Sequence, residues 1–166
     1  MLIRFAGDRV TGGTDDLVPV RLRVGGRYLG SAMAWSAPQR LAAFSALSPF
    51  NGLEIPEEVT VSRQVLAEPS SEIDNRAWAR LSDGTPLITA RGEGQGWIVM
   101  FHVTASPTWS SLPISGLYVD MLKRLMALSA GRPARDQSRK PPTLAVRRPF
   151  SASAAATVLE RPPLAQ

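Results

Sequence analysis

The chain has 166 residues, 44% of them hydrophobic, which suits one domain of ordinary size with a real core. It contains no cysteine, which excludes disulfides, thiolate nucleophiles and cysteine metal sites. The formal net charge is +5, but residues 1–131 hold twelve basic and twelve acidic side chains, so the whole excess lies in residues 132–166. The body of the chain therefore has no overall field that would attract a phosphate backbone.

No apolar run approaches the roughly 18 residues of a membrane helix. The start, MLIRFAGDRV, has too short an apolar run for a signal peptide and lacks a small-residue cleavage site. We therefore expect this chain, taken alone, to be soluble. Its compartment stays open, because a protein without thiols can function on either side of a membrane.

The first predicted elements are strands. A short apolar strand covers Leu2–Phe5, and a β-hairpin follows near residues 18–35. In that hairpin Val18, Val20, Leu22 and Val24 alternate with other residues, as in a half-buried strand, and Gly25-Gly26 forms the turn. A short helix is predicted within the irregular stretch that follows, near residues 39–46.

The second half predicts strands and one clear helix. Strands are expected at residues 57–67, 86–91 and 97–103, with a brief helix or strand around Trp78. The helix spans residues 113–130, with Ser111 as N-cap, Pro113 in its first turn and Gly131 at its end. Its apolar stripe comprises Leu117, Met121, Leu122, Leu125, Met126 and Leu128. The fold class is α/β with a mixed sheet.

The stretch GEGQGWIVMFHVT, residues 92–104, allows two interpretations. A phosphate loop needs a different glycine spacing and leads into a helix, whereas this loop leads into a strand and carries the anionic Glu93. A β-hairpin accounts for it better, because glycine permits the positive φ angles of a tight turn. We predict a hairpin here and no nucleotide cofactor.

His102 is the only histidine and the first candidate for chemistry. Catalysis would need a nucleophile such as Ser106, Ser110 or Ser111, with Asp120 as an orienting carboxylate. No G-x-S-x-G elbow is present, and a histidine at a strand end is more often a hydrogen-bonded structural residue. Trp109 also has two interpretations, because its ring can stack on a ligand or pack in the core. The acidic pairs Asp15-Asp16 and Glu57-Glu58 have no companion ligands at metal-binding spacing, so no metal site is predicted.

Residues 132–166 are rich in proline, alanine, serine and arginine and show no periodicity. We expect this basic tail to be disordered. Weak nucleic-acid binding through Arg139-Lys140 and Arg147-Arg148 is an alternative function, although no aromatic platform is interleaved beyond Phe150.

Residues 83–131 resemble the end of the glutamine-amidotransferase-like region of large bacterial inner-membrane proteins of the aerotolerance-regulator type. Those proteins have a double transmembrane segment and a von Willebrand factor A-like region. The shared pattern is a G-x-G turn, an apolar strand, a W-S-x-L-P loop and an S-G pair that opens a helix. The residues that match it are Gly94, Gly96, Trp109, Ser110, Ser111, Leu112, Pro113, Ser115 and Gly116.

The resemblance implies an amidotransferase-like sandwich over residues 1–131 and an inner-membrane parent protein. It also implies a non-catalytic role in scaffolding or protein interaction within the cell envelope, with protein partners. Glutaminase activity is excluded by the residues themselves, because the cysteine nucleophile is missing. In such a fold a ligand or partner site lies near strand C-terminal ends, which points to His102, Thr104, Trp109 and Ser110. A serine/histidine hydrolase using His102 is the alternative enzyme.

The membrane helices of that group are missing here, and Met1 falls inside what would be a longer domain. A truncated or frameshifted copy of the domain is therefore a further hypothesis.

Overall fold

The computed structural model describes residues 1–7, 16–23 and 32–131, with only the backbone for residues 32–36. The predicted Gly25-Gly26 turn and the tail from residue 132 lie outside these residues. Within them the chain has mixed α/β content, with a four-stranded mixed sheet, a two-stranded sheet and one long helix.

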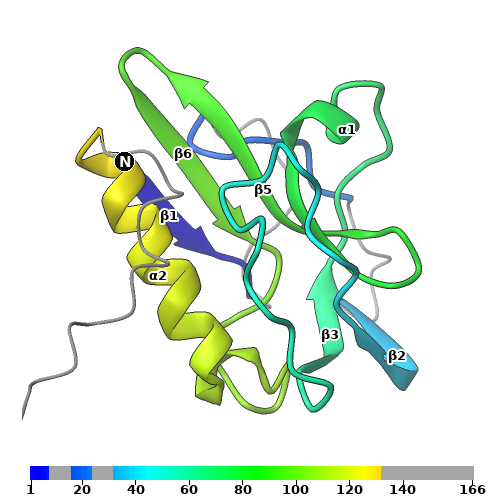
Figure 1. The fold of residues 1–166 in the computed structure, drawn as a ribbon. Coiled ribbons are helices and arrows are strands. Elements are labelled where there is room, and N and C mark those ends of the chain that lie inside the picture. Colours follow the sequence, from blue (N-terminus) through cyan, green and yellow to red (C-terminus); the bar gives the residue numbers. More distant parts are fainter. Residues whose placement is uncertain (8–15, 24–31, 132–166) are drawn as a thin grey trace, which may run out of the picture.

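The larger sheet has the order β1-β6-β5-β4, formed by Leu2–Phe5, Gly96–Phe101, Pro86–Glu93 and Ala77–Arg80. β1 runs parallel to β6, and the other neighbours are antiparallel. The short helix α1, Ile73–Arg76, directly precedes β4. The inner strands β5 and β6 are the most apolar, because both of their faces are covered. Helix α2, Gly116–Ser129, lies alongside β1 and β6 in Figure 1.

The smaller sheet pairs β2, Ala32–Arg40, with β3, Thr60–Val65. Its register shifts between Ala34 and Gln39, around Pro38, which has no N–H for the ladder. The short helix predicted near residues 39–46 is wrong. β2 continues to Arg40, and Leu41 then forms a bridge with Leu81 of the neighbouring sheet.

The turn and most of the return strand of the predicted hairpin near residues 18–35 lie outside the described residues. Its first half, residues 18–23, forms no regular strand, and Leu22 makes a bridge with Ala67. Arg23 donates its N–H to Leu66, and Glu68 donates to Arg21, both at 2.8 Å. The inward side of the alternation is nevertheless as predicted, because Val18, Val20 and Leu22 are buried.

Helix α2 begins later than predicted. Leu112–Ile114 form a separate 3₁₀ turn, and the N-cap of α2 is Ser115, whose hydroxyl accepts the N–H of Tyr118 at 3.3 Å. Ser111 makes no cap. Met126, placed on the apolar stripe, is 61% exposed. Arg124 is buried instead, and it donates to the carbonyls of Pro49 and Asn51.

Apolar side chains cover both faces of the larger sheet. Adjacent residues of a strand point to opposite faces, so Val99 and Phe101 lie on one face and Met100 on the other. The first face packs against α2 in a cluster that includes Leu117, Met121 and Leu125. The second packs against Val18, Val20, Leu22, Val65, Ala67 and Trp109. The sheet is thus the middle layer between α2 and the segments at residues 18–22 and 65–67.

The predicted hairpin at residues 92–96 is confirmed. Glu93 pairs with Gly96 across a two-residue turn, and Gly94 has φ +56°. We expect Gly94→Ala to lower the free energy of unfolding by about 1 kcal/mol, because alanine disfavours this φ. Urea unfolding of the full chain measures the change. Gly92→Ala is the control, since Gly92 has no positive φ and open space at its Cβ. An equal loss of unfolding free energy in both variants would show that the positive φ of Gly94 is not the cause.

Candidate functional site

His102 lies immediately after β6 and is fully buried. Its Nδ1 is 2.8 Å from the Val65 carbonyl oxygen, which can only accept, so Nδ1 carries the proton and donates it. Its Nε2, 3.0 Å from the Thr89 hydroxyl, then accepts from that hydroxyl. The His102 backbone also donates to Leu87 and accepts from Val65, both at 2.8 Å. The residue ties β3 and β5 to the end of β6.

Burial lowers the pKa of His102 from 6.5 to about 4, against the opposing effect of its bond to the Val65 backbone. The ring is therefore neutral at pH 7. Both of its nitrogens are used, one by a carbonyl and one by a threonine hydroxyl, and neither bond goes to a serine. A general base needs a free lone pair within reach of its substrate, so this geometry lends no support to the hydrolase interpretation.

Trp109, Ser110 and Ser111 form an extra antiparallel segment beside the start of β3. The Trp109 carbonyl accepts the N–H groups of Ser62 and Arg63, and Ser110 is bridged to Val61. The Ser111 hydroxyl accepts the N–H of Thr60 at 2.9 Å and donates to the Glu58 carbonyl at 2.8 Å. The W-S-S part of the motif thus secures the loop to the smaller sheet.

The Trp109 ring is buried in the second core cluster, with the Arg63 guanidinium 5.0 Å from its centroid. Ser110 is buried, and its hydroxyl has no hydrogen-bond partner among the described residues. Thr104 is half-buried in the loop after His102. None of these four candidates lines the hollows of about 410, 530 and 290 Å³ found in the described surface. The structure buries His102, Trp109 and Ser110 and leaves Thr104 half-buried.

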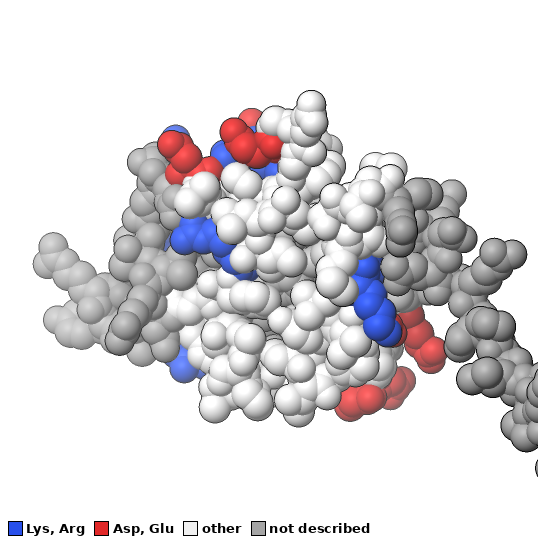
Figure 2. All heavy atoms as spheres, turned by 90° about the vertical axis from the view of Figure 1, so that its left-hand side faces the viewer, with Lys and Arg blue, Asp and Glu red and all other residues white. Residues whose placement is uncertain are grey.

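Sequence reasoning missed a surface at the outer edge of β1, which we call the edge surface. It consists of the exposed residues Met1, Leu2 and Phe5. The exposed residues Val119 and Met126 share one face of α2, but that face is opposite the one that packs on the sheet. Phe5 joins β1 to this helix, with its ring 6.5 Å from that of Tyr118. Figure 2 looks at this side of the molecule, where uncharged atoms occupy most of the view and the Lys and Arg side chains stand apart.

The backbone of β1 adds polar groups to the edge surface. β1 has a neighbour on one side only, because it ends the described sheet. Ala6 donates its N–H to Phe101 at 2.8 Å, and backbone groups alternate along a strand. The N–H and C=O groups of Ile3 and Phe5 therefore point away from β6. An unpaired strand edge with apolar flanks is a template for another strand.

Within the described ranges, no group of three or more His, Asp or Glu side chains is arranged to hold a metal ion. The described helices include none that is both long and apolar enough to cross a membrane. No family model, curated protein or solved structure matches the chain.

Proposed function

We propose that this domain is a non-catalytic protein-interaction module that binds a partner at the edge surface. The observation that supports this most directly is the outer edge of β1, which has no neighbouring strand among the described residues and carries the exposed side chains of Leu2 and Phe5. A partner segment would add a strand to β1 through the outward groups of Ile3 and Phe5, and its apolar side chains would pack beside Leu2 and Phe5. Burial of His102 favours this interaction role over hydrolysis.

We also propose that the domain has the amidotransferase-like sandwich and belongs to an inner-membrane scaffold of the cell envelope. Its support is the order of the W-S-x-L-P loop and the S-G pair before α2, together with a mixed sheet that this helix covers. Any attachment to the membrane would come from segments other than the described helices. Such a scaffold needs binding surfaces and no reactive nucleophile, which agrees with the missing cysteine.

Selection of peptides from a random library on the full chain tests the interaction module. We expect enriched peptides with alternating β-branched and apolar residues, because a strand that joins β1 presents alternate side chains to α2. Their binding should slow amide hydrogen exchange at Ile3 and Phe5. Phe5→Lys should weaken binding at least tenfold, since it places a charge among the exposed apolar side chains of β1.

Ser71→Lys is the matched control, because Ser71 is exposed in the turn before α1, far from β1 in sequence. Failure to enrich any peptide, or peptides that bind Phe5→Lys and the control equally well, would refute the edge surface as the binding site.

A further inference from the structure

An arginine of α2 lies in a hollow beside two tryptophans. Arg124 is only 6% exposed, and it lies on the same face of the helix as Met121 and Leu128. It lines a hollow of about 290 Å³ together with Trp78 of β4 and Trp97 of β6, and we call this hollow the tryptophan cleft. The cleft therefore combines one buried cation with two aromatic rings.

The charge of Arg124 is not balanced by an acidic side chain within the described residues. Its Nη1 donates to the Pro49 and Asn51 carbonyls at 3.3 and 3.4 Å, which are long hydrogen bonds. Its Nε and Nη2 have no hydrogen-bond partner in the part of the chain that the structure describes. Asp120, one turn earlier on α2, is bonded to Lys123 instead. Because burying an unpaired charge is costly, this side of the guanidinium is suited to an anion.

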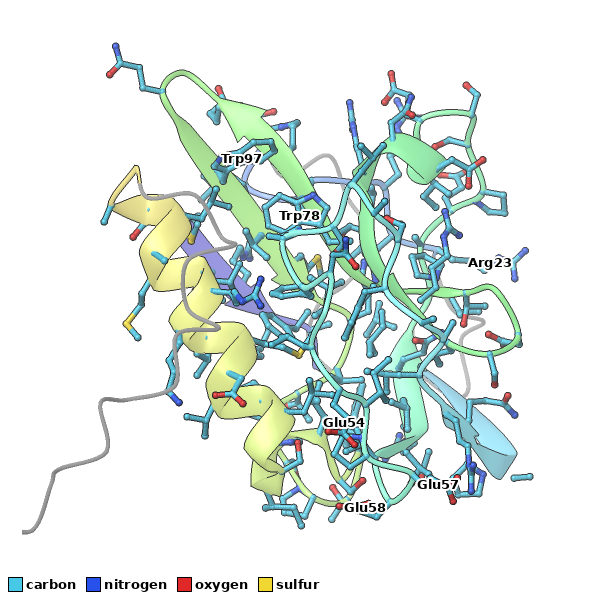
Figure 3. All side chains as sticks on the ribbon, in the orientation of Figure 1. Arg23, Glu54, Glu57, Glu58, Trp78 and Trp97 are labelled. Carbon is cyan, nitrogen blue, oxygen red and sulfur yellow. The ribbon has the colours of Figure 1, made fainter. Side chains whose placement is uncertain are left out.

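The two rings give the cleft a flat apolar wall. Their centroids are 5.1 Å apart with an interplanar angle of 55°, and Figure 3 shows the two rings side by side. The inner ring, Trp78, also packs edge-on against Phe50 at 6.2 Å, whereas the outer ring, Trp97, is 38% exposed. Leu47, 95% exposed, lines the same cleft. A flat apolar group in the cleft would stack on an indole face and cover side chains that are exposed.

The charge and size of the cleft narrow the class of ligand. Nε and Nη2 lie on one edge of the planar guanidinium, so they can donate two parallel bonds to a carboxylate. A phosphate monoester carries up to two negative charges, but among the described residues Arg124 is the one cation that lines the cleft. A volume of about 290 Å³ is at the small end of ligand pockets, which favours a small molecule over a polymer.

We propose that the tryptophan cleft binds a small aromatic carboxylate, with the carboxylate on Arg124 and the flat ring against Trp97. Leu47 and Leu128 would supply further apolar contact from the same lining. The site goes beyond the proposed interaction module and does not rest on it, because the edge surface consists of other residues. Either can fail without the other.

Titration of the full chain with naphthylacetate tests the site. The chain carries isotope-labelled tryptophan, and the indole N–H signals are assigned with single Trp→Phe variants. We expect the signals of Trp97 and Trp78 to shift with a dissociation constant of about 1 mM or lower, whereas Trp109 in the second core cluster should not shift. Naphthylacetamide, which has the same ring without the charge, should bind about tenfold more weakly. Acetate, which lacks the ring, should cause no shift at the same concentration.

Variants separate the charge from the ring. Arg124→Gln should lower the affinity for naphthylacetate about tenfold and change the affinity for the amide less than about twofold, because only the carboxylate needs the charge. Trp97→Ala should weaken the binding of both probes. Arg21→Gln is the matched control, because it removes the same charge from the separate hollow of about 410 Å³, and both affinities should stay as in the parent chain. If Arg124→Gln does not fold, the two probes compared in the parent chain and in Trp97→Ala still decide.

Four results would overturn the proposal. The first is the absence of any shift of the Trp97 and Trp78 signals at about 10 mM naphthylacetate. The second is equal affinity of the parent chain for the carboxylate and the amide. The third is unchanged affinity for naphthylacetate in a folded Arg124→Gln chain. The fourth is a loss of affinity in Arg21→Gln as large as in Arg124→Gln, because the carboxylate would then lie in the other hollow.

Discussion

Replacing His102 with alanine is expected to lower the free energy of unfolding by about 2–4 kcal/mol at pH 7.5. The substitution empties a fully buried position and leaves the Val65 carbonyl and the Thr89 hydroxyl without their imidazole partner. Urea unfolding of the full chain measures the loss. The size of the effect would show that the only histidine serves the fold.

The contribution of His102 to the free energy of unfolding should also decrease as the pH falls. The folded pKa is about 4 and the unfolded value 6.5, so the unfolded state binds the proton first as the pH falls. The free energy of unfolding of the parent chain should fall by about 3 kcal/mol through this residue as the pH falls from above 6.5 to about 3, below both pKa values. His102→Ala has no histidine to protonate, so the difference in unfolding free energy between the two chains should become smaller as the pH falls.

The matched control for His102 is Thr104→Ala, a half-buried position in the following loop. It should cost less than about 1 kcal/mol and leave the pH dependence as in the parent chain. A parent–His102→Ala difference that stays constant from pH 7 to pH 4 would show that the histidine is not buried in its neutral form.

Trp109→Ala is the second large effect we expect, a loss of about 3–5 kcal/mol in the free energy of unfolding. The ring fills the second core cluster beside Val65 and Met100, and it contacts the Arg63 guanidinium. Trp109→Phe should cost less, because it keeps most of the apolar volume. Urea unfolding of the three chains gives the comparison.

Trp97→Phe is the control for Trp109, since both substitutions remove an indole but Trp97 is 38% exposed. It should cost less than about half as much as Trp109→Phe. If Trp109→Ala unfolded at nearly the parent urea concentration, the ring would not be a core residue, and a ligand-binding role for Trp109 would again be open.

The features that the sequence predicts best are local. The β5–β6 turn follows from a glycine that can adopt positive φ between two apolar strands, and both the glycine and the strands are adjacent in sequence. The inward side of Val18, Val20 and Leu22 follows from alternation alone. The structural interpretation of His102 could be favoured because no nucleophile elbow is present, but the Val65 carbonyl that it binds lies 37 residues away in the sequence.

Other features depend on which distant segments meet. Residues 21–23 pair with residues 66–68, a choice that the Gly25-Gly26 signal alone did not indicate. Met126 is counted with the apolar stripe although it lies about 140° around the helix from Met121, which places it on the exposed side. The pair of Trp78 and Trp97 joins β4 to β6 across β5, which requires the strand order.

The sequence by itself determined the absence of thiol chemistry, the neutral body with its basic tail, and the class of elements that build the domain. These depend on composition and on short-range periodicity, which need no knowledge of the fold. Only the tertiary structure decided that His102 and Trp109 are buried and that β1 lies at the edge of the described sheet. Burial and pairing are set by segments that are far apart in the chain, so they appear only when those segments are brought together.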